Sequence, residues 1–338
     1  MHRSLAIAIV AAMAVPASAI NVVIDYTYAG SFFSTGTTNG QQARATVEAA
    51  ADFFSEILDD SFSRIETPDD YISTATGGDP VTFSWNWEKR FTNPSTGAQV
   101  TISNPTIPED EFRVYVGARN LGGNILGLAG PGGWGSSQGG SWYFPSQRAE
   151  IDAITADFTA ALENRDQGAN DFGAWGGVIT FDSPNTWNYD HTVEPTFGQS
   201  DLFSVAIHEL GHTFGIGTSD EWSALIAGNT FFGLESFAAN GNAYPALADP
   251  AHWARDTQST VFGGTGQQEA SMDPDITIGT RKVWTELDAA GLVDIGWDVV
   301  APVTPDLPGD ANGDGSVDLL DLDILGSEFG TSSGGLQM

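Results

Sequence analysis

The chain has 338 residues, and its 12 lysines and arginines are outnumbered by 44 aspartates and glutamates, which gives a formal net charge of −32. This charge excludes nucleic-acid binding through a basic surface and attachment to anionic membranes. Hydrophobic residues make up 41% of the chain, so it can bury a substantial core. The absence of cysteine excludes disulfides, thiolate zinc sites and iron–sulfur clusters, so any metal must be held by histidine, carboxylate or backbone oxygen.

The first nineteen residues have the pattern of a secretory signal peptide. His2 and Arg3 precede the apolar run 5–15, and the small residues of 16–19 suit a signal peptidase. We therefore expect cleavage after Ala19 and a secreted protein. A membrane anchor is the alternative reading, but the apolar run is too short to cross a bilayer, which takes about 20 residues. No later stretch approaches that length, so we expect no membrane span.

Hydrophobic spacing predicts the elements of the remaining chain. Alternating apolar residues predict strands, and apolar residues repeating every three to four positions predict helices. The predicted strands are 22–28, 81–91, 111–118 and 175–181, and the predicted helices are 41–62 and 148–162. The glycine-rich segment 121–142 is predicted to be a loop. This order of elements indicates an α+β fold.

The end of the chain differs in composition from what precedes it. Residues 301–308 contain three prolines, which is typical of a semi-rigid linker. We therefore expect a main domain over residues 20–300, a linker over 301–308 and a separate segment over 309–338.

A metal-binding motif lies on a further predicted helix, for which Ser200 is the expected N-cap. Residues 208–212 read HELGH. His208 and His212 are four residues apart, so both imidazoles project from one helix face and can bind one zinc ion. Glu209 is placed to reach a water molecule beside that ion. The pattern therefore predicts a zinc-dependent hydrolase, with Gly215 ending the helix.

A catalytic zinc ion needs a third protein ligand and an open position for water. Without the signal peptide, the remaining histidines are His191, which precedes the helix, and His252, which follows His212 by forty residues. We interpret His191 as a surface or supporting residue and His252 as the candidate ligand. The alternative ligands are the carboxylates of Asp220, Glu221 and Glu235.

Three motifs together resemble the metzincin zinc peptidases, and specifically the leishmanolysin-type group. They are HExxHxxG at 208–215, a histidine after a long insert at His252, and Met272 followed by Pro274 in a predicted methionine turn. Compact metzincins place the third histidine six residues after the second, where this chain has Thr218.

The resemblance covers roughly residues 170–298. It includes a predicted closing helix at 285–297, in which Thr285 and Asp288 are spaced as a capping box. Leishmanolysin is rich in disulfides and this chain has no cysteine, so we carry over the site and leave out the peripheral architecture.

The resemblance implies a metzincin-like domain with a twisted mixed sheet and an active-site helix. It implies that the strand at 178–181 lies beside the cleft and pairs with an extended peptide. The site residues that it implies are His208, His212 and His252 as zinc ligands, Glu209 as general base, and Met272 as the hydrophobic floor of the site.

The acidic C-terminal segment has the spacing of a calcium loop. Residues 310–321 place oxygen ligands at the positions that an EF-hand uses, with Gly315 at the sharp turn. The predicted calcium ligands are Asp310, Asn312, Asp314, Ser316, Asp318 and Asp321. Aspartate at the last position resembles a type I dockerin repeat, a module that uses two copies. The single copy here is expected to be incomplete or to pair with another module, such as a cohesin-like or cell-surface partner.

These features together predict a secreted zinc endopeptidase that acts on proteins or peptides and carries one zinc ion and one calcium ion. Two alternatives remain open. One is a non-catalytic attachment protein that keeps a degenerate peptidase scaffold, against which the retained Glu209 argues. The other is a zinc hydrolase of non-peptide esters or amides.

Overall fold

The computed structural model describes residues 20–301. The predicted signal peptide and the predicted calcium-binding segment lie outside the described residues, and of the predicted linker only Ala301 is described. Within residues 20–301, none of the helices is both long enough and apolar enough to span a bilayer.

The described chain contains helices and strands in mixed order, as predicted for an α+β fold. The helices are α1 (Thr38–Ile57), α2 (Pro145–Asn164), α3 (Leu202–Thr213), α4 (Asp220–Ala224), α5 (Leu234–Ala239) and α6 (Glu286–Asp294). The longer strands are β1 (Asn21–Asp25), β3 (Val81–Thr92), β4 (Gln99–Ser103), β5 (Glu111–Arg119), β6 (Gly127–Pro131), β7 (Gly133–Gly140) and β8 (Gly176–Asp182). The shorter strands are β2 (Tyr71–Ser73), β9 (Trp187–Asn188), β10 (Ser200–Asp201), β11 (Ile226–Ala227), β12 (Thr230–Phe231), β13 (Leu247–Asp249), β14 (His252–Trp253), β15 (Gln258–Thr260) and β16 (Gln267–Glu269).

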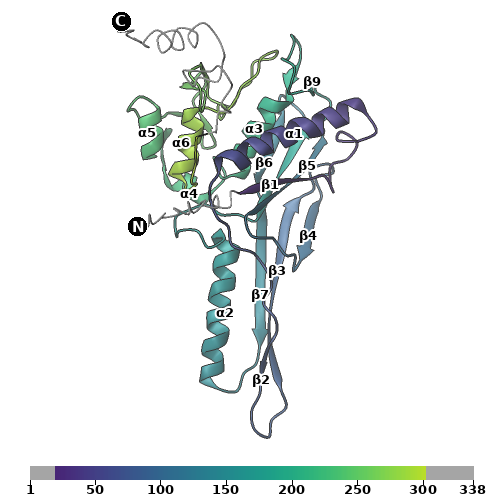
Figure 1. Cartoon of the computed structure of the whole chain (residues 1–338), viewed down its shortest axis with the longest axis vertical. Helices are drawn as coiled ribbons and strands as arrows, with labels where there is room; N and C mark the ends of the chain where they lie inside the picture. Colours follow the sequence, from purple (N-terminus) through teal and green to yellow (C-terminus); the bar gives the residue numbers. More distant parts are fainter. Residues whose placement is uncertain (1–19, 302–338) are drawn as a thin grey trace, which may run out of the picture.

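The main sheet has the strand order β1-β5-β8-β6. The first three strands are parallel, and β6 pairs antiparallel with β8 at the edge. Helix α3 contacts β6, β8 and α1, so both helices cover the same face of the sheet (Figure 1). Apolar residues of α1 three to four positions apart, among them Val47, Ala50 and Phe54, are fully buried there. This packing fixes the position of α3, which carries the predicted metal motif.

A second sheet, in which β3 pairs with β2, β4 and β7, forms a long projection with α2 (Figure 1). Its own core contains Trp85 and Trp87 of β3 together with Ile151 and Phe158 of α2. Trp85 Nε1 also donates a hydrogen bond of 2.9 Å to the Thr155 hydroxyl of α2. The projection therefore has a hydrophobic core separate from the one around α3.

The prediction that 121–142 is a loop was wrong, because this segment contains β6 and β7. Strand β7 pairs with β3 over eight residues. Some of the glycines that suggested a loop are needed by neighbouring side chains: a Cβ at Gly135 would lie 2.7 Å from the Arg90 guanidinium, and one at Gly132 would overlap the Trp175 ring. At these two positions glycine reflects close packing.

Two smaller expectations also need correction. Ser200 is not the N-cap of α3: it pairs with Trp187 in β10, and the Asp201 carboxylate accepts the capping hydrogen bond from Ser204 N at 3.1 Å. The strand at 178–181 has no free edge, because β8 is flanked by β5 and β6. The edge strand next to β8 is β6. The capping box of Thr285 and Asp288 at the start of α6 is confirmed.

Candidate metal centre and cleft

Helix α3 brings two predicted ligands to one side. His208 and His212 are one turn apart, and their Nε2 atoms are 3.1 Å from each other. His252 comes from β14, forty residues later, and its Nε2 is 3.2 Å from that of His212. The ligand atoms of the three histidines all lie within 4.8 Å of one another. The Nε2 atoms of two histidines on α3 and of one on β14 thus converge on one point.

Each imidazole is oriented by a hydrogen bond at its other nitrogen. Nδ1 of His208 lies 2.7 Å from the Ser271 carbonyl, and Nδ1 of His212 lies 2.8 Å from the Ile216 carbonyl. Because a carbonyl oxygen only accepts, both Nδ1 atoms must donate. His252 Nδ1 is 2.8 Å from Asp249 Oδ1, which is likewise an acceptor when ionised. These bonds leave the Nε2 lone pairs of all three rings facing each other.

This arrangement fits a zinc ion. Tetrahedral zinc with bonds of 2.0–2.1 Å places its nitrogen ligands about 3.3 Å apart, close to the observed separations. Three converging lone pairs repel one another unless a cation lies between them. Burial also lowers the pKa of His208 and lowers that of His212 to about 4, which favours the neutral imidazole that binds metal.

Glu209 is buried beside the triad, with 5% of its surface exposed. Its carboxylate lies against β6 so closely that a Cβ at Gly127 would overlap it. Burial raises the pKa of Glu209 to about 8 in the metal-free site. The positive charge of a bound zinc ion would lower this pKa again, which would favour the ionised carboxylate that can accept a proton.

Met272 is fully buried beneath α3. A Cβ at Gly211 would lie 2.6 Å from the Met272 sulfur and 2.8 Å from the Trp284 ring. The glycine inside the helix therefore has a packing reason: it lets Met272 approach between the two histidines of the motif.

Asp288 of α6 fixes the turn that contains Met272. Its carboxylate accepts hydrogen bonds from the backbone N–H groups of Ser271 (2.7 Å) and Met272 (3.0 Å) and from the Trp253 indole (2.9 Å). Since the Ser271 carbonyl orients His208 and Trp253 adjoins His252, Asp288 joins both sides of the metal centre.

The metal centre lies in a hollow of about 800 Å³. It is lined by β6 and the segment before it, by α3, and by residues of the segment 271–278. Ile125, Leu128 and Ile278 line this hollow and are each more than half exposed. We call this hollow the cleft. Its edge strand and apolar rim can accommodate an extended chain with apolar side chains.

The structure separates the other candidates from the centre. The histidine triad is the one group of three or more histidine or acidic side chains close enough to share a metal ion within residues 20–301, so Asp220, Glu221 and Glu235 lie apart from it. His191 hydrogen bonds to the Thr46 hydroxyl at 3.2 Å, away from the triad. Thr218 donates a hydrogen bond of 2.6 Å to the His212 carbonyl, so it supports the end of α3.

Sequence reasoning missed three residues of this region. Asp249 precedes His252 by three positions, a spacing that carries a signal only once His252 is known to be a ligand. Gly127 was assigned to a loop. Asp288 was identified as a helix cap, but its bonds to the methionine turn depend on long-range packing that no local pattern encodes.

A match to a known protein family covers part of this site. Residues 162–232 match the sequence model of the Matrixin peptidase family, a region that includes α3 with His208 and His212 and ends before His252. None of the curated proteins and none of the solved structures compared matches the chain. The family match and the histidine triad support a zinc metallopeptidase of the metzincin type.

Proposed function

We propose that this protein is a secreted zinc endopeptidase in which His208, His212 and His252 hold the metal and Glu209 is the general base. The observation that carries the proposal is the convergence of three Nε2 lone pairs, with Nδ1 of each ring already engaged. A protein that had lost catalysis would have no need to keep a buried carboxylate beside such a site.

The reaction requires a nucleophile, a proton acceptor and a proton donor. A bound zinc ion would supply Lewis-acid polarisation of the scissile carbonyl and activation of a water molecule. Glu209 would accept a proton from the attacking water molecule as the water oxygen bonds to the carbonyl carbon. When the carbon–nitrogen bond breaks, Glu209 returns the proton to the leaving amine.

Strand β6 is the surface on which the substrate backbone would bind. It pairs with β8 on one side, and its other side borders the cleft. An extended peptide can add to this edge through main-chain hydrogen bonds. This role replaces the one predicted for β8, which has no free edge.

Glu209→Gln tests the chemistry. The variant keeps the size of the side chain but cannot accept the proton, so we expect it to retain zinc and to lose about 10² to 10⁴ in kcat/KM on an unstructured protein substrate. Metal analysis and circular dichroism establish that the site and fold are intact. Activity equal to that of the wild type would mean that Glu209 is not the base.

We further propose that residues 309–338 bind calcium and attach the enzyme to a partner or surface. The support is the ligand spacing of residues 310–321 and the linker composition of 301–308. A calcium titration of the full chain by calorimetry, compared with the Asp310→Ala/Asp321→Ala variant, tests this separately from proteolysis. Equal calcium binding by the two proteins would contradict the assignment.

A further inference from the structure

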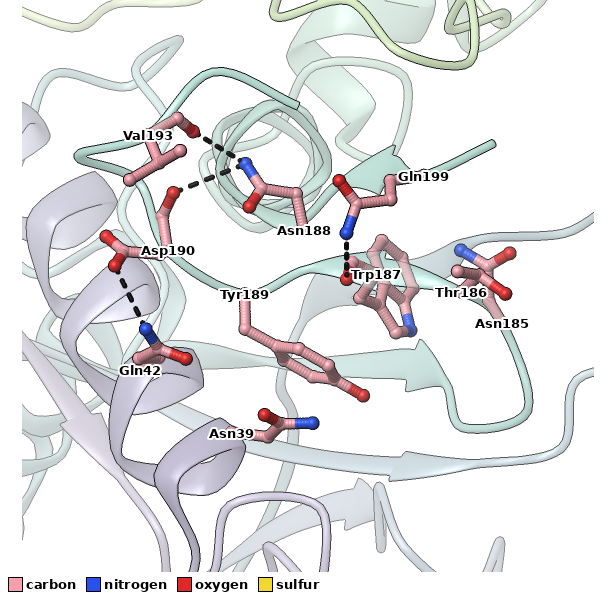
Figure 2. Close-up of a pocket in the computed structure, with 10 residues that line it drawn as sticks. All are labelled: Asn39, Gln42, Asn185, Thr186, Trp187, Asn188, Tyr189, Asp190, Val193 and Gln199. Atoms are coloured by element: carbon pink, nitrogen blue, oxygen red, sulfur yellow. Dashed lines mark hydrogen bonds between the residues drawn. The ribbon is translucent and has the colours of Figure 1, made fainter. Parts of the chain in front are cut away.

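A second hollow lies beside the cleft, between the first turns of α1 and the segment 185–199 (Figure 2). Its volume is about 560 Å³. Asn185 lines both this hollow and the cleft, so the two meet at that residue. We call the second hollow the side groove.

The side groove is lined mostly by uncharged polar residues. Among the described residues, the Asn185 Nδ2 atom is buried without a hydrogen bond. Asn39 of α1 and Tyr189 line the same hollow (Figure 2). Because the Asn185 nitrogen has almost no accessible surface, the groups that a ligand in the groove can reach are the Asn39 amide and the Tyr189 hydroxyl.

Charge in the side groove is limited to one carboxylate that is already engaged. Asp190 Oδ2 accepts a hydrogen bond of 3.0 Å from Gln42, and Oδ1 accepts one of 3.0 Å from the backbone of Thr192. Its negative charge still disfavours an acidic ligand. The lining therefore suits an uncharged polar group that both donates and accepts hydrogen bonds.

The direction of β6 indicates which end of a bound peptide reaches the groove. The residue before β6, Leu126, accepts a hydrogen bond from Asp182 N at 2.8 Å, so this end lies near Asn185. The opposite end of β6 lies near Thr218. A Cβ at Gly130, in that part of the strand, would be 3.9 Å from the Thr218 methyl carbon. Antiparallel pairing is the more stable kind, and it directs the C-terminal half of a peptide toward the Asn185 end.

We propose that the side groove is a distal subsite that binds substrate residues C-terminal to the scissile bond and selects uncharged polar side chains, such as glutamine. This inference rests on the proposed endopeptidase function. Glutamine can both donate to and accept from the Asn39 amide and the Tyr189 hydroxyl, whereas leucine can do neither and glutamate adds a second negative charge beside Asp190.

The test compares peptides that share one cleavage site. One peptide ends shortly after the scissile bond. Three further sets are extended on the C-terminal side, and each set places one residue type (glutamine, glutamate or leucine) at each added position in turn. For the wild type we expect one position at which glutamine raises kcat/KM about tenfold over the short peptide and over the other two residues. Asn39→Ala/Tyr189→Phe should reduce this ratio to about one, and the exposed control Asn170→Ala should keep it.

Equal effects of glutamine, glutamate and leucine, or an unchanged ratio in the double variant, would overturn the subsite. So would a gain that appears only on N-terminal extension. In each of these cases the short peptide is still cleaved, so the proposed function stands. If the zinc-loaded wild type cleaves no peptide of the series and no unstructured protein, the proposed function fails instead.

Discussion

Single residues at this centre are determined by the space around them. His208, Glu209 and His212 could be predicted from the sequence because helical periodicity alone places them. Asp249 and Gly127 could not, because their roles arise only when β14 and β6 pack against α3. A glycine that leaves room for a carboxylate and a glycine in a loop look the same in sequence.

Gly127 tests this view directly. Gly127→Ala would place a methyl group where the Glu209 carboxylate lies, so Glu209 should be displaced. We expect kcat to fall about 10 to 100-fold with zinc content unchanged, since displacement of a catalytic group by about 1 Å can cost 10²-fold.

Gly130→Ala is the matched control on the same strand. A Cβ at Gly130 meets its nearest neighbour at 3.9 Å, which is ordinary contact, and the backbone there allows alanine. Its kcat should stay within about twofold of the wild type. If the two variants lose activity equally, the loss comes from a disturbance of β6 and not from displacement of Glu209.

Elements were predicted well where the signal is local. Helices α1, α2 and α6 and strands β1, β3, β5 and β8 appear close to their predicted positions, because apolar spacing and capping residues determine them. Strands β6 and β7 were missed because their sequence is rich in glycine and their pairing is with distant strands. Trp175 fills the space that a side chain at Gly132 would occupy, and Arg90 fills the space that a side chain at Gly135 would occupy.

Asp288 of α6 also binds the methionine turn and Trp253 of β14, so its replacement should destabilise all three elements. Asp288→Asn removes the negative charge that binds the methionine turn and replaces one acceptor oxygen with a donor. We expect the free energy of unfolding to fall by about 2–4 kcal/mol, because hydrogen bonds to charged groups contribute about 1.5–3 kcal/mol each. Chemical denaturation measures this.

Glu286→Gln on the same helix is the control for that experiment. Glu286 accepts a single hydrogen bond, from Gly263 N at 3.2 Å, at an exposed position. Its replacement should change the unfolding free energy by less than about 0.5 kcal/mol. A comparable loss in both variants would show that α6 is generally sensitive and that Asp288 has no special role.

At the scale of the whole molecule, the end of the described chain belongs to the main core. Trp297 is buried against Phe214, and its indole donates a hydrogen bond of 2.8 Å to the Phe214 carbonyl. Val300 N donates to the Ile57 carbonyl at the end of α1 at 2.8 Å. Residues up to Val300 therefore belong to the main domain.

Truncation should distinguish these parts. A mature chain ending at Val300 keeps all of these contacts, so we expect it to retain full proteolytic activity. A chain ending at Gly296 loses Trp297 and should be destabilised by at least about 3 kcal/mol, the cost of removing a buried tryptophan side chain. Thermal unfolding and peptide hydrolysis measure both. If the chain ending at Val300 is inactive, the C-terminal segment is not separate from the peptidase domain.

We propose that three histidines from two distant parts of the chain hold one catalytic zinc ion. The most direct test is zinc content per chain in the purified wild type and in two single variants, His252→Ala and His191→Ala. We predict one zinc ion in the wild type and in His191→Ala, whose side chain lies outside the triad, and near-complete loss in His252→Ala. Full zinc retention by His252→Ala would contradict the account.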